Sequence, residues 1–247
     1  MRRPQQTELP LHRGTWGGWR PDAGRRAGPN PRVRHRRRPA FPARFPCHVT
    51  LKVREGLASL RTGRVVREVE ATLRRGKERE GFRVLHYSIQ GDHLHAIIEA
   101  EGREALGRGM KSLAARFARA VNRGLGRRGP VLLDHYHLHV LETPLEVRSA
   151  LAYVLLNARK HRAERLGGAG GRRLSATPLD PASSGRWFRG WRGAGLAVGL
   201  AAAGPPAVAE PRTWLLRVGW RRHGLLDPLE IPGGSRAPKQ RRAASRG

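Results

Sequence analysis

A His-Leu-His triplet at residues 93–95 has the residue types and the spacing to bind a metal ion. It follows a short turn at residues 90–92 and opens the run HLHAIIEA, which alternates as a β-strand does. Side chains two residues apart on a strand point to the same side, so His93 and His95 can reach one cation while Leu94 points into the core. Imidazoles are common ligands of divalent metals. The triplet therefore predicts a metal site, with a merely polar strand surface as the alternative.

A second run of histidines raises the same question. The stretch DHYHLHVLE places His135, His137 and His139 on one face of a strand predicted at residues 132–142. Three histidines in this pattern extend over about 13 Å, too far for a single ion. No nearby acid or cysteine has the spacing to complete a ligand shell. The sequence favours a polar face along which nucleic acid passes, and a metal-dependent hydrolase built on this cluster is a weaker alternative.

Another polar group lies on a helix predicted over residues 144–166. The apolar stripe of this helix is formed by Val147, Leu151, Val154 and Leu155. At about 100° per residue, Tyr153 falls well off that stripe. Asn157, one turn further, and Lys160 share the side of Tyr153. A phenol, an amide and an amine on one helical face form an unusual set for packing alone.

The hydrophobic periodicity of residues 47–166 predicts the elements that hold these side chains. Their order is strand, helix, strand, strand, helix, strand, followed by a last helix that begins at Pro144. The predicted strands are residues 48–53, 82–89, 93–100 and 132–142, and the first two helices are residues 61–79 and 103–125. This is the order of an α+β, ferredoxin-like split βαβ sandwich with two helices on one face of its sheet. The other face is left for a site, and the last helix, from the same chain or a partner's, can cover it.

The charge of the chain predicts a polyanionic partner. Its 247 residues include 49 Lys and Arg but only 19 Asp and Glu, a formal net charge of +30. Residues 1–46, a basic and largely disordered arm, and residues 167–247, a basic and partly disordered extension, are predicted to flank the folded domain of residues 47–166. A codon bias of a GC-rich genome is the alternative source of so much Arg. The predicted DNA contacts are Lys111, Arg119, Arg123, His135, His137 and Lys160.

Other features narrow the class of protein. The single cysteine, Cys47, excludes internal disulfides and cysteine-rich zinc modules, and it fits a reducing cytoplasm. The most apolar run, GLAVGLAAAGPPAVA, is broken by Gly and Pro and is too short for a bilayer. The opening MRRPQQTELP has no apolar stretch behind its arginines. We therefore expect a soluble, cytoplasmic protein with no membrane partner.

Three motifs together resemble the HUH single-tyrosine transposases, in which U is a bulky apolar residue. They are HVTLKV, HYSIQGDHLHAIIEA and YVLLNARKH, and the likeness is closest to the REP-associated tyrosine transposases. It covers residues 47–166, while GGWRPDAGRR in the arm and RTWLLRVGWRRHGLL in the tail resemble extensions of that group. The tail motif is also expected to form a short docked element. One departure is Ala158, since this branch often has Pro after the helix asparagine.

The resemblance implies that His93, His95 and Asn157 bind a divalent ion, Mg²⁺ or Mn²⁺, and that Tyr153 is the nucleophile. It further implies a DNA transposase that cleaves and rejoins single-stranded or hairpin-flanking DNA, such as repeated extragenic palindromes, through a 5'-phosphotyrosine. A homodimer in which Tyr153 acts across the interface is compatible with this. The alternative is a catalytically inactive nucleic-acid-binding protein that keeps the transposase fold.

Overall fold

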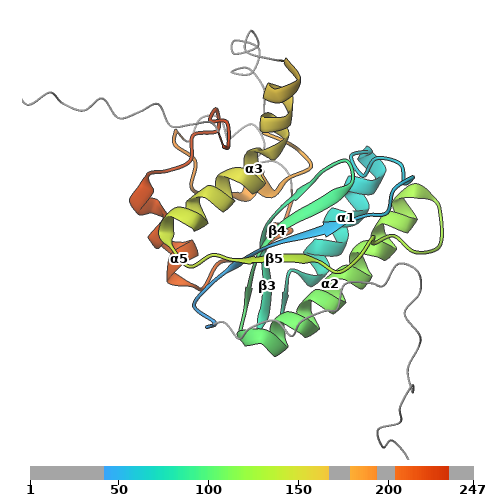
Figure 1. The fold of residues 1–247 in the computed structure, drawn as a ribbon, viewed down its shortest axis with the longest axis horizontal. Helices are drawn as coiled ribbons and strands as arrows, with labels where there is room; N and C mark the ends of the chain where they lie inside the picture. Colours follow the sequence, from blue (N-terminus) through green and yellow to red (C-terminus); the bar gives the residue numbers. More distant parts are fainter. Residues whose placement is uncertain (1–41, 167–178, 194–203, 234–247) are drawn as a thin grey trace, which may run out of the picture. The chain divides into compact units, whose positions relative to one another are not determined.

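The computed structural model describes residues 42–166, 179–193 and 204–233 (Figure 1). Most of the predicted N-terminal arm and parts of the predicted C-terminal extension lie outside these ranges. Within them, no helix is long and apolar enough to cross a membrane.

A five-stranded antiparallel sheet forms the centre of the described structure. Its strands are β1 (Cys47–Lys52), β2 (Glu78–Arg79), β3 (Phe82–Ile89), β4 (His93–Ala100) and β5 (His137–Val140). Their spatial order is β2-β3-β4-β1-β5. Since β4 lies between β1 and β3, and β1 lies between β4 and β5, each βαβ unit is split by one strand. The predicted ferredoxin-like α+β fold is confirmed, with the two-residue β2 as an addition.

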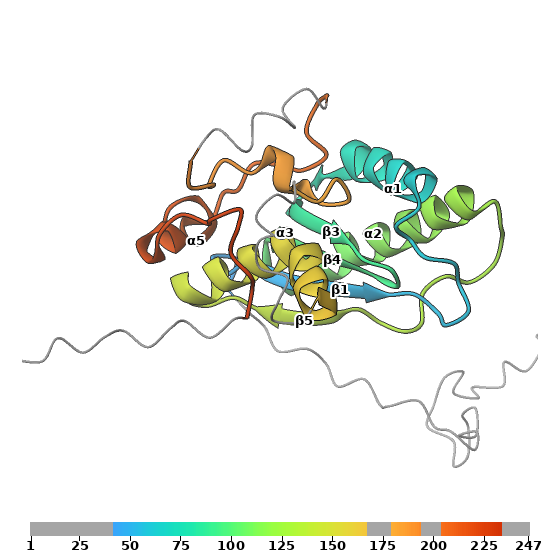
Figure 2. The same cartoon turned by 90° about the horizontal axis from the view of Figure 1, so that it is seen from above.

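Helices α1 (Gly63–Gly76) and α2 (Gly102–Leu125) cover one face of the sheet (Figure 2). They pack closely because α2 has no side chain at Gly124, where a Cβ atom would lie 2.7 Å from the Cα atom of Val65. Helix α2 ends at Gly126, which adopts the left-handed conformation that glycine takes without a steric penalty (φ 64°). The apolar side chains of β1 and β4 pack beneath these helices and form the first core.

Helix α3 (Pro144–Leu166) covers the opposite face, so the cover predicted for this face comes from the same chain. The helix begins with a capping box: the Thr143 backbone N–H donates to the Glu146 carboxylate (3.0 Å), and the Glu146 N–H donates to the Thr143 hydroxyl (3.2 Å). The predicted apolar stripe of α3 is buried. The helix runs on past Ala158 without a break, as expected where proline is absent.

The tail motif docks against α3, as the sequence suggested. It contains α5 (Trp214–Arg217) and the short 3₁₀ helix η4 (Gly219–His223), and η2 (Ser184–Trp187) precedes them. Apolar side chains of α5 and η4 join α3 in a second core, whereas Trp187 of η2 packs against the first core. The buried carboxylate of Glu99 accepts hydrogen bonds from the backbone N–H groups of Arg212 (3.0 Å) and Thr213 (2.8 Å), which fixes this segment to β4.

The strand predicted over residues 132–142 is shorter in the structure. Leu132 bridges to Val53, but regular pairing with β1 begins only at His137, which lies opposite Thr50. The intervening segment is two residues longer than the part of β1 that it faces, and the chain bends at Asp134 and His135. His135 therefore lies before β5 and not on the same strand face as His137, which corrects the sequence prediction.

Candidate active site

His93 and His95 lie side by side on β4, on the sheet face that α3 covers. The strand register places His95 opposite Thr50 of β1 and His93 opposite Lys52. The two Nε2 atoms are 2.9 Å apart, and the ring centroids are 4.4 Å apart. The same nitrogen of both imidazoles thus points toward one position.

The other ring nitrogen of each histidine has its own partner. Nδ1 of His93 is 2.6 Å from Oδ1 of Asp92. This hydrogen bond lowers the pKa of Asp92, so its carboxylate is ionised and acts only as an acceptor. Nδ1 of His93 therefore donates a hydrogen bond to this carboxylate, and its Nε2 atom faces that of His95. Nδ1 of His95 is 3.0 Å from the Thr50 hydroxyl and 3.1 Å from Nε2 of His48. Partners of this kind orient metal-binding histidines in other proteins.

Burial keeps two of these imidazoles neutral. It lowers the pKa of His95 to about 3, with a further contribution from His93. Burial likewise lowers the pKa of His48 to about 4, with a contribution from His139. Near pH 7 neither ring is protonated, and neutral imidazole is the form that binds a metal.

Tyr153 of α3 packs against His95 and His48. Its ring centroid is 5.1 Å from that of His95 and 5.8 Å from that of His48. The ammonium nitrogen of Lys160 is 5.2 Å from the centre of the Tyr153 ring, within cation–π range. The half-buried Tyr153 also lines a cleft of about 840 Å³ together with His48 and His139. The polar helix face that the sequence predicted is therefore brought to the histidines of β4.

Asn157 lies one turn beyond Tyr153 and is fully buried. Neither its Oδ1 nor its Nδ2 atom has a hydrogen-bond partner among the described residues. Buried amides nearly always have a partner, because an unmade hydrogen bond in the interior is costly. The Oδ1 atom of Asn157, which lies on the same side of α3 as Tyr153, is thus available as a metal ligand.

These residues fit a divalent cation. In the part of the chain that the structure describes, no three His, Cys, Asp or Glu side chains converge on one point. His93, His95 and Asn157 could supply two imidazole nitrogens and one amide oxygen to such an ion. A set of three protein ligands is typical of catalytic metal sites, whereas structural sites have four.

Two histidines of the second run, His137 and His139 on β5, lie on the same sheet face as His95, with β1 between β5 and β4. His137 is opposite Thr50 and His139 is opposite His48, so β1 separates both from His95. Both side chains are exposed, and so is His135. These histidines border the cleft beside Tyr153 through His139 alone.

The basic residues predicted to contact DNA do not lie together. Lys111 and Arg119 are exposed on α2, on the opposite side of the sheet from the histidine pair. Arg123, also on α2, pairs with Glu68 of α1 (2.9 Å). Of the predicted cations, Lys160 is the one that lies at the site.

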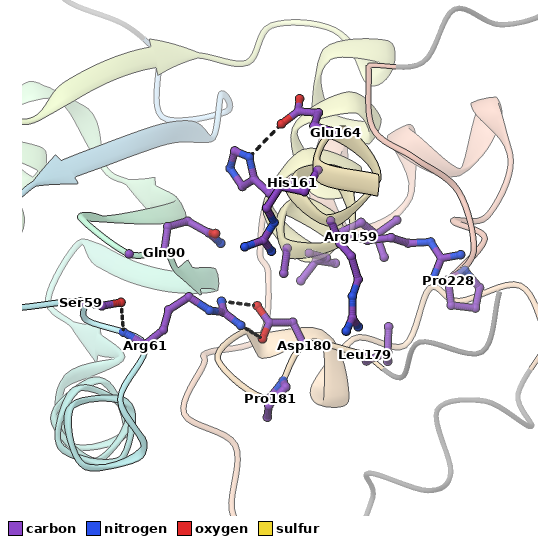
Figure 3. A pocket seen from close by; sticks show the side chains of 16 residues that line it. Ser59, Arg61, Gln90, Arg159, His161, Glu164, Leu179, Asp180, Pro181 and Pro228 are labelled. Carbon is purple, nitrogen blue, oxygen red and sulfur yellow. Dashed lines mark hydrogen bonds and ion pairs between the residues drawn. The ribbon is translucent and has the colours of Figure 1, made fainter. Parts of the chain in front are cut away.

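His48 was not predicted as a site residue, although a signal for it exists in the sequence. The alternation that buries Val49 and Leu51 in the first core must place His48 and Thr50 on the other face, beside the histidine pair. A second cleft, of about 830 Å³, lies between Arg61, Gln90 and the C-terminal half of α3 and was not predicted either (Figure 3). That cleft combines segments far apart in the chain, which no local pattern joins.

Solved structures that this chain resembles include two that illustrate how loose the likeness is. No family model matches the chain, and no curated protein matches it. A solved structure of a REP-associated tyrosine transposase bound to a REP hairpin is similar over 72% of this chain and 92% of that one, with 17% identity and a TM-score of 0.45. A bacterial tRNA(His) guanylyltransferase-like protein in complex with GTP is similar over 56% of this chain and 73% of that one, with 14% identity and a TM-score of 0.36. Both TM-scores are below 0.5, so neither likeness is evidence for a function of this chain.

Proposed function

We propose that this protein is a metal-dependent DNA transposase that cleaves and rejoins single-stranded or hairpin-flanking DNA. The observation that carries the proposal is the contact of Tyr153 with His95, whose Nε2 atom is 2.9 Å from that of His93, on the helix that also carries the unsatisfied amide of Asn157. The resemblance of the three sequence motifs to REP-associated tyrosine transposases gives these residues the same roles.

In the proposed reaction, the Tyr153 hydroxyl oxygen attacks the phosphorus of a DNA phosphodiester. The new bond is a 5'-phosphotyrosine, and the bond from phosphorus to the 3' oxygen breaks. The phenol loses its proton, and the departing 3' oxygen gains one and becomes a free hydroxyl. Because the phosphodiester energy is kept in the tyrosine ester, a second 3' hydroxyl can displace the tyrosine and join another strand.

His93, His95 and Asn157 would hold the divalent ion, Mg²⁺ or Mn²⁺. When bound, such an ion neutralises phosphate charge and stabilises the leaving oxygen. Asp92, Thr50 and His48 have a positioning role, since they contact the Nδ1 atoms of the two histidines and keep both Nε2 atoms directed at one position. Lys160 adds positive charge beside the tyrosine ring.

Covalent capture on DNA tests this function. The full-length protein, incubated with a labelled hairpin carrying single-stranded flanks and with Mn²⁺ or Mg²⁺, should form an adduct that survives denaturing electrophoresis. The adduct should disappear with EDTA and in Tyr153→Phe, but not in the matched control Tyr136→Phe, because Tyr136 packs against the first core on the other side of the sheet. An intact adduct in Tyr153→Phe would show that the nucleophile is wrongly assigned. Salt-dependent DNA binding without any adduct would instead support the inactive nucleic-acid-binding alternative.

A further inference from the structure

A third cleft lies beside the docked tail. Its lining comes from β3, η2, residues 188–190, residues 204–212, α5 and η4, and its volume is about 760 Å³. None of its lining residues belongs to the candidate active site or lines the two clefts described above. This tail cleft therefore has no part in the proposed reaction, although its volume is within the range of ligand-binding sites.

The buried part of the lining is apolar. Large apolar side chains that are each at most 8% exposed come from Leu85, Phe188, Val208, Leu216 and Trp220. The ring centroids of Phe188 and Trp220 are 5.5 Å apart. Both rings also approach the backbone closely, since a Cβ atom at Gly190 would lie 2.4 Å from each of them. A ligand that enters the tail cleft therefore meets a close-packed apolar wall.

The charged part of the lining is mostly positive. Three of its five arginines have a carboxylate partner: Arg186 contacts Glu70, Arg189 contacts Glu210 and Arg212 contacts Glu78. The other two, Arg217 and Arg221, are exposed and form no ion pair among the described residues. Residues 212–223 contain four arginines and no acidic residue. The tail cleft thus has the charge that suits an acidic ligand.

Two large side chains of the same segment stay exposed. Trp214 of α5 is 49% exposed, and Val218, which follows Arg217, is 53% exposed. Between them, Leu215 and Leu216 are buried in the second core and hold the segment in place. Trp and Arg are enriched among the residues that carry the binding energy of protein–protein interfaces. The composition of this surface therefore favours a protein partner.

The aromatic side chains also favour a peptide over a nucleic acid. Single-stranded nucleic acids bind by stacking their bases on aromatic rings. The rings here already have a partner, as Phe188 has Trp220, Trp187 has Arg186 and Trp214 has Arg222. An apolar peptide side chain needs no open ring face, and the carboxylates beside it can each pair with the two-pronged guanidinium of an arginine.

We propose that the tail cleft docks an acidic segment of a partner protein, with an apolar side chain in the cleft and flanking carboxylates on Arg217 and Arg221. Removal of the apolar side chain from water supplies affinity, and the carboxylates supply the negative charge that residues 212–223 lack. This proposal does not depend on the reaction at Tyr153, because the tail cleft shares no residue with the candidate active site.

The test is fluorescence anisotropy of a labelled peptide, Asp-Asp-Phe-Asp-Phe-Asp, with the full-length chain. Because the chain has a net charge of +30, any acidic peptide is attracted to it, and matched peptides are needed to measure the specific part. Replacing each Phe with Ser should weaken binding about tenfold, because the apolar contact is lost. Replacing each Asp with Asn should also weaken it about tenfold, because the ion pairs are lost.

Charge reversal on the protein locates the binding surface. Arg217→Glu/Arg221→Glu should weaken binding of the native peptide about tenfold, because it removes two cations and adds repulsion. The matched control is Arg64→Glu/Arg67→Glu, an exposed pair on α1 that changes the net charge equally but does not line the tail cleft. It should change affinity less than about twofold. If the double variant does not fold by circular dichroism, Arg217→Glu alone should still weaken binding about threefold.

Equal binding of the Phe and Ser peptides, or an equal loss in the two double variants, would overturn the proposal, since either result shows attraction by net charge alone. A labelled oligothymidine separates the two classes of partner. The tail-cleft variant should lose no more affinity for this DNA than the α1 control does. A greater loss would assign the tail cleft to nucleic acid and would likewise overturn the proposal.

Discussion

Replacing Asn157 with leucine should make the metal-free protein more stable, which is unusual for a polar residue proposed to act in catalysis. The side chain is fully buried, and neither polar atom has a partner among the described residues. Leaving such a group unsatisfied costs about 1–3 kcal/mol, and an apolar side chain of similar shape avoids that cost. In a protein of this size about 1 kcal/mol corresponds to about 2–4 °C in the melting temperature, so Asn157→Leu should raise Tm by about 2–12 °C.

The assay is thermal unfolding of the full-length chain in EDTA, followed by circular dichroism. The matched control is Asn122→Leu, because Asn122 donates to the carbonyl of Gly129 (2.8 Å) and accepts from Arg127 (3.2 Å). Removing an amide that has partners should lower Tm, in contrast to Asn157→Leu.

The effect of Mn²⁺ on the melting temperature tests the role of Asn157 as a metal ligand. A ligand that binds only the folded protein stabilises it by about 2.7 kcal/mol at one hundred times its Kd. Mn²⁺ should therefore raise the Tm of the native chain but have a smaller effect on Asn157→Leu, which lacks one of the three proposed donors. If Asn157→Leu lowers Tm as Asn122→Leu does, or responds to Mn²⁺ as the native chain does, the reasoning about this residue is refuted.

Two further predictions concern stability. Burial lowers the pKa of His86 to about 3, so its ring is neutral in the folded state but takes up a proton below about pH 6.5 when the chain unfolds. The contribution of His86 to stability is therefore present above pH 6.5 and is lost as the pH falls toward 3, by about 2 kcal/mol between pH 7 and pH 5. The buried His48 and His95 add to the loss that urea unfolding measures, so this loss should be about 2 kcal/mol smaller in His86→Gln than in the native chain, and an equal loss in that variant would contradict the assignment. In α2, Gly124→Ala should lower Tm because the new Cβ would lie 2.7 Å from the Cα atom of Val65. Gly107 is exposed, and a Cβ atom there would have no atom within 4 Å, so Gly107→Ala should raise Tm slightly. Tm changes of the same sign in both variants would contradict the close packing of α1 and α2 at Gly124.

Most of the fold follows from local periodicity. The turn before His93 and the alternation of HLHAIIEA predict β4 at the bounds that the structure has, and the stripe of α2 predicts that helix to within one residue. The length of β5 does not follow, because the two extra residues before His137 have no signature in the apolar pattern of the strand. Strand length there depends on the register with β1, which is a tertiary property.

The candidate active site also follows only in part from the sequence. The helical face of Tyr153, Asn157 and Lys160 follows from spacing alone, and the structure brings it to the histidine pair. The burial of Asn157, and its lack of a hydrogen-bond partner among the described residues, depend on how α3 packs. The spacing of residues along the helix does not predict that packing. The second cleft forms because Arg61 and α3 both line it, and only the tertiary fold brings these two segments together.

The measurement closest to the central claim is peptide mapping of the protein–DNA adduct. The full-length chain is trapped on a single-stranded DNA hairpin with Mn²⁺, digested with nuclease and protease, and analysed by mass spectrometry. If Tyr153 is the nucleophile, one modified peptide, containing YVLLNAR, should carry the nucleotide, attached through its 5' phosphate to Tyr153. A nucleotide on any other residue, or on Tyr153 through its 3' phosphate, would contradict it.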